Sequence, residues 1–125
     1  MSIGIGKKLR VEKTVKTEDS AASYGSGLLE VFSTPAMIAL MENSAHLLAK
    51  SILQSDQDTV GTEVNIKHLR ATPVGMKVFA EAEITEIDGR KITFSVRAYD
   101  QSGEIGAGTH IRYIIDPKKF MSKLI

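Results

Sequence analysis

The distribution of apolar and polar residues predicts one strand, one long helix and four further strands. Residues 8–16 alternate loosely between polar side chains and valines, which is typical of a strand with one polar face. A helix begins at Ser33-Thr34-Pro35, because a Ser or Thr cap followed by Pro is a helix-start signal. Good helix formers extend it to about Leu53. The other strand-like stretches cover 59–69, 76–87, 91–100 and 105–115.

Turn-forming residues predict how these elements are connected. Asp88-Gly89 lies between two strand-like stretches and is a strong two-residue hairpin signal, and residues 101–103 form a second turn of this kind. We therefore expect the last four strands to form an antiparallel meander. Residues 17–29, before the helix, are rich in turn formers and are expected to be a mobile connection.

The first half of the helix indicates how the elements pack. Residues 35–41 are apolar on every side, so this segment must be buried, and a sheet can cover it. We expect an α+β fold in which a curved antiparallel sheet wraps around one long central helix. Such a sheet has open edges, and pairing two sheets in a symmetric homodimer would cover them. Without a repeat or linker, residues 1–125 are expected to form a single domain.

The composition of the chain argues against several kinds of protein function. A net charge of +1, from 16 basic and 15 acidic residues without a basic block, argues against a nucleic-acid partner. The absence of cysteine excludes disulfides, a thiolate nucleophile and a zinc–thiolate site, and it fits a reducing compartment. No stretch approaches the ~18 apolar residues of a membrane span, and the N-terminus lacks a signal-peptide pattern. We therefore expect a soluble, cytoplasmic protein.

Three polar residues stand out, although each has a structural alternative. Thr34 is a helix-cap residue whose hydroxyl could also contact a substrate. Glu42 begins an exposed stripe with His46 and Lys50, or it lies at the edge of the buried zone. At that edge, partial desolvation prepares a carboxylate for covalent or acid–base chemistry. His68, near the end of a strand, gains functional meaning only if it lies near Glu42.

Two other features favour structural interpretations. His46 and His110 are lone histidines, a class that is usually structural or exposed. Residues 106–110 contain too few glycines, at the wrong spacing, to cradle a phosphate. These glycines are instead expected to let a ligand or a helix approach a strand closely.

The singled-out residues lie in stretches that resemble the hotdog-fold thioesterases, most closely the fluoroacetyl-CoA thioesterase group. Several matches follow one another in order through nearly the whole chain, which no single motif does. The resemblance implies a hotdog fold and a homodimer, with further assembly left open and active sites at the dimer interface. The matching stretches are Val31-Phe-Ser-Thr-Pro-Ala-Met37, Leu40-Met-Glu42, Gly61-Thr62, His68 with Ala71-Thr-Pro-Val-Gly75, and Glu104-Ile-Gly-Ala-Gly-Thr-His110 with Arg112.

The resemblance also implies which residues form the site. In this family, the catalytic set is a threonine at the helix start, a glutamate two turns on and a histidine from the strand before the Ala-Thr-Pro turn. These fall on Thr34, Glu42 and His68. Gly61 corresponds to a glycine that lines the acyl site, and Arg112 to an arginine near the ligand.

The segment before the helix departs from the family pattern. The fluoroacetyl-specific member has phenylalanines there that act as a lid, whereas this chain has Gly25 and Leu28 in the corresponding places. Leu28 is therefore a candidate substrate-binding residue. The resemblance does not extend to fluoroacetate selectivity, and it does not identify the acyl group of the substrate.

The expected reaction is hydrolysis of a small or short acyl-CoA, without a metal and without a cofactor other than the CoA of the substrate. Glu42 would attack the thioester carbonyl or position a water, His68 would transfer protons, and Thr34 would orient Glu42 or the substrate. Backbone N–H groups at the 35–37 end of the helix, where Pro35 itself donates nothing, are candidates to stabilise the oxyanion together with the positive end of the helix dipole. Lysines near the C-terminus contact the phosphates of CoA or form a solvated tail: Lys118, Lys119 and Lys123.

Two other functions stay open at this point. A hotdog hydratase or dehydratase also binds an acyl thioester, but it would usually pair an aspartate with a histidine in a different sequence setting. A non-catalytic acyl-CoA binding module would normally carry an output element, and no helix-turn-helix is visible in the sequence.

Overall fold

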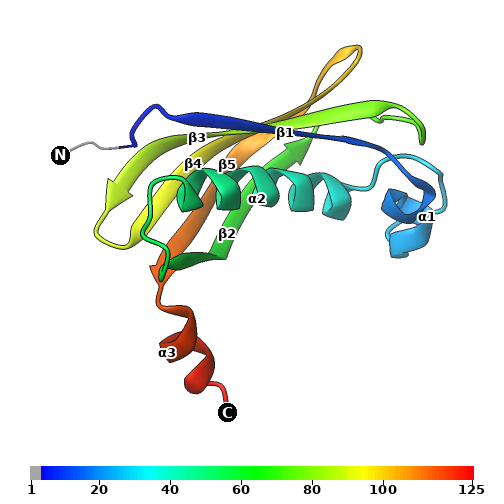
Figure 1. The fold of residues 1–125 in the computed structure, drawn as a ribbon. Coiled ribbons are helices and arrows are strands. Elements are labelled where there is room, and N and C mark those ends of the chain that lie inside the picture. The colour runs from blue at the N-terminus through cyan, green and yellow to red at the C-terminus, as the bar shows by residue number, and fades with distance from the viewer. Residues whose placement is uncertain (1–3) are drawn as a thin grey trace.

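A five-stranded antiparallel sheet and one long helix make up most of the molecule (Figure 1). The computed structural model describes residues 4–125. The strands lie in the order β1-β3-β4-β5-β2, and α2 crosses one face of the sheet. None of the helices in this part of the chain is long and apolar enough to cross a membrane. The elements are β1 (Lys8–Thr14), η1 (Thr17–Asp19), α1 (Ala21–Tyr24), α2 (Thr34–Lys50), β2 (Asp58–His68), β3 (Lys77–Asp88), β4 (Lys91–Asp100), β5 (Gly103–Ile115) and α3 (Pro117–Ser122).

The helix α2 packs one side of its apolar first half against the sheet. The buried residues of this half are Ala36, Met37, Leu40 and Met41. Pro35 and Ala39 are exposed, so within one chain the segment is buried on one side only. A Cβ at Gly106 would lie 2.6 Å from Met37 Sδ, so glycine lets α2 approach β5. The expectation of a close helix–strand approach at this segment is confirmed.

The position of β2 differs from the predicted four-strand meander. β3, β4 and β5 follow one another as antiparallel hairpins, with Gly89-Arg90 rather than Asp88-Gly89 as the first two-residue loop. β2 does not pair with β3 but with β5, at the edge of the sheet. The reason is the connection of residues 69–76, which is too long for a tight hairpin and carries the chain to β3 on the far side of β4.

The connection between β1 and α2 is more regular than its turn formers predicted. It contains η1 and α1, and the buried Asp19 carboxylate accepts hydrogen bonds from Lys13 Nζ at 2.7 Å and from Lys16 N at 2.8 Å. Ser20 Oγ caps α1 by accepting from Ser23 N at 3.1 Å. Side-chain contacts therefore order a segment whose local composition indicates only turns.

The helix α3 is absent from the predicted elements, although its start signal is present in the chain. Asp116 caps the helix by accepting hydrogen bonds from the N–H groups of Lys118 and Lys119, and Pro117 is its first residue. The helix extends away from the sheet (Figure 1). The lysines expected near the C-terminus therefore lie on and just after a short helix rather than on an irregular tail.

The two edge strands of the sheet differ in exposure. β1 alternates between exposed and half-buried positions, whereas residues 61–65 of β2 are all exposed. β2 also has a bulge at Thr62, where the register with β5 shifts between Gly61 and Glu63. This bulged part of the edge lies beside the candidate site.

Candidate active site

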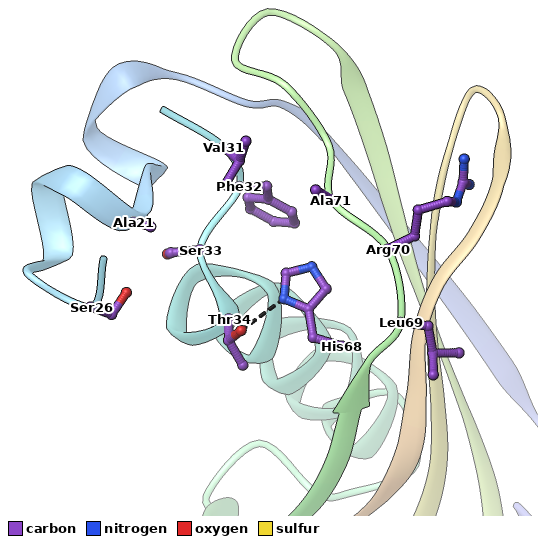
Figure 2. Close-up of a pocket in the computed structure, with 10 residues that line it drawn as sticks. All are labelled: Ala21, Ser26, Val31, Phe32, Ser33, Thr34, His68, Leu69, Arg70 and Ala71. Atoms are coloured by element: carbon purple, nitrogen blue, oxygen red, sulfur yellow. Dashed lines mark hydrogen bonds between the residues drawn. The ribbon is translucent and has the colours of Figure 1, made fainter. Parts of the chain in front are cut away.

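Thr34 and His68 meet where α2 begins. Ser33 Oγ caps the helix by accepting a hydrogen bond from Ala36 N at 3.1 Å, so the interpretation of Thr34 as the helix cap is wrong. The Thr34 hydroxyl instead lies 2.7 Å from His68 Nδ1, at the end of β2 (Figure 2). The fold thus brings two of the predicted site residues into direct contact.

A pocket of about 350 Å³ opens beside this pair. His68 Nε2 is buried and has no hydrogen-bond partner among residues 4–125. Burial lowers the pKa of His68, so at pH 7 its imidazole is neutral and able to accept a proton. The pocket is lined by Ala21, Ser26, Val31, Phe32, Ser33, Thr34, His68, Leu69, Arg70 and Ala71 (Figure 2).

The Glu42 carboxylate lies two turns further along α2 and faces β2. A Cβ at Gly61 would lie 2.9 Å from Glu42 Oε2, so the glycine leaves room for the carboxylate at this point of the strand. The Glu42 side chain is 41% exposed, and its nearest charged or titratable neighbour is His110, at 3.9 Å from Oε2 to Nε2. The carboxylate is therefore accessible and held by no hydrogen bond from the described residues.

Glu42, His46 and Lys50 are all partly exposed, but the pairs along the helix that were expected of an exposed stripe do not form. His46 Nε2 pairs with Asp58 Oδ1 at 2.7 Å, and Lys50 Nζ donates a hydrogen bond to Gln57 O at 2.7 Å. Both side chains therefore turn toward the start of β2 and the loop before it, and the i, i+4 pairs along α2 do not form. His46 has the structural role that sequence analysis expected of it.

Arg112 is a buried cation on β5, where it is the register partner of Gly61. It is 7% exposed, and it donates hydrogen bonds from Nε to Thr59 Oγ1 at 2.7 Å and from Nη2 to Thr59 O at 3.0 Å. Burial lowers the pKa of Arg112 and the nearby Glu42 acts in the opposite direction, but a guanidinium remains charged in proteins. Arg112 therefore faces Glu42 as a cation fixed by the protein.

The start of α2 does not offer the oxyanion donors that were expected. Ala36 N donates to Ser33 Oγ, and Met37 N donates to Ser33 O at 2.9 Å. Pro35 has no N–H to donate. The prediction that residues 35–37 supply these donors is wrong, because the capped helix start uses the N–H groups itself.

The site residues form two groups along α2. Thr34 contacts His68, whereas Glu42 lies with Gly61 and Arg112. Thr34 and Glu42 are separated by about 12 Å of helix rise, at about 1.5 Å per residue. Within one chain, the groups lie along a single helix face that borders β2.

Two residues fall outside these predicted groups. Leu28 is 93% exposed and does not line the pocket next to His68. His110, which sequence analysis treated as structural, is 1% exposed and lies between Glu42 and Arg112. Its i, i+2 spacing from Arg112 on one strand is the available sequence signal, because such residues share a face of the sheet.

The arrangement offers an accessible carboxylate, a neutral imidazole bonded to a hydroxyl, and a fixed guanidinium. The carboxylate suits the role of nucleophile or base toward an activated carbonyl, and the imidazole suits that of proton carrier. Within one chain His68 contacts Thr34 and lies in a different group from Glu42, so the proximity of His68 and Glu42 on which its functional meaning depended is not found there. No cluster of three or more His, Cys, Asp or Glu side chains in residues 4–125 is arranged to hold a metal ion.

Known proteins share both the sequence and the fold. A model of the family described as fluoroacetyl-CoA-specific thioesterase (FlK) matches residues 15–118. The fluoroacetyl-CoA thioesterase of Streptantibioticus cattleyicolor is 37% identical over 95 residues, which cover 76% of this chain and 68% of that protein. The solved structure of FlK gives a TM-score of 0.90 at 30% identity, covering 96% of this chain and 93% of the other.

Two further structures extend this comparison. A variant of FlK solved in complex with fluoroacetate and CoA gives a TM-score of 0.86 at 30% identity, covering 93% of this chain and 98% of the other. A hot-dog-like protein from Thermanaerovibrio acidaminovorans shares the fold, with a TM-score of 0.88 at 20% identity over 99% of this chain and 95% of the other. The predicted α+β hotdog fold is confirmed. The chain belongs to the fluoroacetyl-CoA-specific thioesterase family.

Proposed function

We propose that this protein hydrolyses a small or short acyl-CoA thioester to the free acid and CoA. The observation that carries the proposal is the accessible Glu42 carboxylate, which reaches β2 only because residue 61 is glycine. Membership of a thioesterase family supports the same reaction, and FlK has been solved with CoA bound.

In the proposed mechanism, the two groups of residues act on one substrate from the two subunits of a homodimer, because within one chain they lie apart. Glu42 attacks the thioester carbonyl or orients a water that does so. His68 carries the proton, and Thr34, which contacts His68 rather than Glu42, fixes the orientation of the imidazole. The C–S bond then breaks, and a thiolate leaves. Where a water has attacked, the proton that His68 takes from it passes to the thiolate, and the free acid is the other product. Where Glu42 has attacked, a water then cleaves the anhydride between the acyl group and Glu42, its proton passes through His68 to the thiolate, and the free acid is released. Arg112 stabilises negative charge at Glu42 through space without touching the substrate.

The proposed acyl group is small. The family is described by its action on fluoroacetyl-CoA, whose acyl group has two carbons, and the pocket of about 350 Å³ next to His68 has room for such a group. Leu28, the candidate substrate-binding residue, would reach the acyl group only if the segment before α2 folds over the pocket. We therefore propose no fluoroacetyl preference.

We also propose that the active form is a homodimer paired through β2. Residues 61–65 of this edge strand are all exposed, and an unpaired edge readily pairs with another strand. The proposed interface adjoins Gly61 and Glu42, so a second copy would border the site. The absence of cysteine supports the cytoplasm as the proposed location.

The test is release of free thiol from a panel of acetyl-, fluoroacetyl-, branched, aromatic and long-chain acyl-CoA. Glu42→Gln and His68→Ala are compared with the wild type, and Glu86→Gln, an exposed β3 position far along the sheet, is the matched control. We expect turnover with at least one small acyl-CoA, retained in the control and lowered on the order of 10²-fold or more in the two site variants.

Other outcomes would point to other functions. Wild-type turnover in a folded Glu42→Gln variant would contradict the proposed role of the carboxylate. Water addition to enoyl-CoA without thiol release would identify a hydratase. Tight stoichiometric binding of acyl-CoA without turnover would identify a binding module.

A further inference from the structure

His110 is enclosed by four elements of the fold. It is 1% exposed on β5, and its ring stacks on Phe94 of β4 with centroids 6.1 Å apart. Its Nδ1 lies 2.8 Å from the carbonyl oxygen of Glu63 on β2, and its Nε2 lies 3.2 Å from Arg112 Nη1. From α2, Glu42 Oε2 approaches Nε2 to 3.9 Å. Glu42 and Arg112 are the charged groups that face the imidazole.

The two hydrogen bonds fix the tautomer of His110. A guanidinium can only donate, so Nε2 must accept the hydrogen bond from Arg112 Nη1. A carbonyl oxygen can only accept, so Nδ1 must carry the proton and donate it to Glu63 O. The ring is therefore neutral with a bare Nε2, in agreement with the direction in which burial moves the pKa of His110, which is downward. A bare Nε2 cannot donate a hydrogen bond to Glu42.

The hydrogen bonds of Arg112, including the one that the bare Nε2 of His110 accepts, fix its guanidinium apart from Glu42. Three of the five N–H groups are engaged: that of Nε and one of Nη2 with Thr59, and one of Nη1 with His110. A Cβ at Gly61 would lie 2.9 Å from Glu42 Oε2 and 3.2 Å from Arg112 Nη1, so both groups flank the same point of β2. Yet within residues 4–125 neither a hydrogen bond nor an ion pair joins them.

We propose that His110 is a positioning residue that holds one N–H of Arg112 Nη1, keeps the guanidinium oriented out of hydrogen-bond reach of Glu42, and thereby leaves the carboxylate free to act on the thioester or on water. The inference rests on the proposed role of Glu42. An arginine–carboxylate pair uses the lone pairs of the carboxylate in charge-assisted hydrogen bonds, which makes it a poorer nucleophile and base. A guanidinium that is close but already engaged still stabilises the charge through space.

Two substitutions separate the contacts of His110. The amide nitrogen of Asn corresponds to His Nδ1, so His110→Asn keeps the donor to Glu63 O and loses the acceptor for Arg112. The amide oxygen of Gln reaches the position of Nε2, so His110→Gln keeps the acceptor and loses the donor. Each variant lacks one buried hydrogen bond, so a merely structural role predicts similar losses in both.

We expect the positioning role to affect only one of the two variants. In His110→Asn, kcat falls on the order of tenfold while KM changes less than about twofold, because general acid–base groups contribute about 10²- to 10⁴-fold and misplacement removes part of this. His110→Gln retains kcat within about threefold of the wild type. Crystal structures of both variants should show Arg112 hydrogen-bonded to Glu42 in the Asn variant only.

The crystal structures keep this inference separate from the proposed function. If wild-type protein releases no thiol from any acyl-CoA, the proposed function fails, and the Arg112–Glu42 distance in His110→Asn still decides the inference. A folded His110→Asn variant in which Arg112 stays away from Glu42 would overturn it. Equal losses of kcat in the Asn and Gln variants would overturn it as well.

Discussion

At the residue scale, the site depends on a glycine, Gly61, which has no side chain. Gly61 lies where Glu42 Oε2, His110 Cε1 and Arg112 Nη1 would all be within 3.2 Å of an added Cβ. The backbone of Gly61 does not have a positive φ, so an alanine there would be tolerated by the strand itself. The glycine is therefore needed for the position of the carboxylate rather than for the strand conformation.

The substitution Gly61→Ala tests this assignment. The new methyl group should push the flexible Glu42 carboxylate away from β2 and lower kcat on the order of tenfold, because small misplacements of reacting groups are costly. The free energy of unfolding should also fall, by about 1–3 kcal/mol, because the methyl group crowds His110 and Arg112, which are buried and cannot move aside as the end of Glu42 can. Thiol release and urea denaturation measure the two quantities. Full activity would show that the carboxylate does not act from this position.

The buried histidines make stability depend on pH in a defined window. Burial lowers the pKa of both His68 and His110 below 6.5, so in acid the unfolded chain binds protons that the folded chain does not. The contribution of these histidines to the free energy of unfolding is fully present above pH 6.5. It declines as the pH falls toward their pKa values in the folded state. The lowered pKa of the carboxyls Asp19, Asp58 and Asp100 acts only near and below pH 3.8.

We therefore expect the melting temperature to fall between pH 7 and pH 5. The fall should be shallower in His110→Gln, because one of the two titrating groups is gone. Differential scanning fluorimetry over this range measures both slopes. A wild-type melting temperature that stays level or rises toward pH 5 would contradict this assignment.

At the element scale, α2 both packs against the sheet and carries Thr34 and Glu42. Its start was predictable from Ser33-Thr34-Pro35, because capping is a local interaction. The separate roles of Ser33 and Thr34 were not predictable, because the role of Thr34 depends on His68 from a distant strand. The helix was predicted to end near Leu53 but ends at Lys50. Just after Lys50, Ser51 Oγ donates a hydrogen bond to Leu48 O and closes the last turn.

Substitutions at these two neighbouring residues test their separate roles. Ser33→Ala should lower the free energy of unfolding by about 1 kcal/mol, because it removes the helix cap. Thr34→Ala should change stability much less but should lower kcat, because Thr34 contacts His68 instead of capping the helix. Urea denaturation and thiol release measure the two effects. The reverse pattern would restore the interpretation of Thr34 as the cap.

At the scale of the whole molecule, β2 belongs both to the candidate site and to an exposed edge of the sheet. Its bulged segment carries Gly61, and residues 61–65 form an exposed edge. β1, at the other edge, carries charged side chains that pair with β3, such as Lys8 with Glu83. Charged edges resist pairing with a second sheet, so β2 is the edge better suited to a dimer interface.

The substitution Val64→Glu tests the proposed dimer. It places a charge on an exposed apolar side chain in the middle of β2, and two copies would face each other across the interface. We expect a monomer in light scattering coupled to size-exclusion chromatography, whereas Thr14→Glu on β1 should leave the dimer intact. A wild-type protein that is itself monomeric would refute the proposed assembly.

The chain alone determined the long helix and the five strands of this fold and the residue types of its site. Local signals sufficed: alternating valines, the cap-and-proline start of α2, and the turn at Gly89, whose φ of 62° suits glycine. The family resemblance selected Thr34, Glu42 and His68, but the pairing of Thr34 with His68 required the folded chain.

Only the tertiary structure decided which residues meet. The place of β2 beside β5, the approach of Glu42 to Gly61 and the enclosure of His110 all join segments far apart in the sequence. Such contacts depend on the path of connections and on the shape of side chains, which periodicity does not encode. His110 shows the difference most clearly, because its tautomer follows from two partners on two different strands.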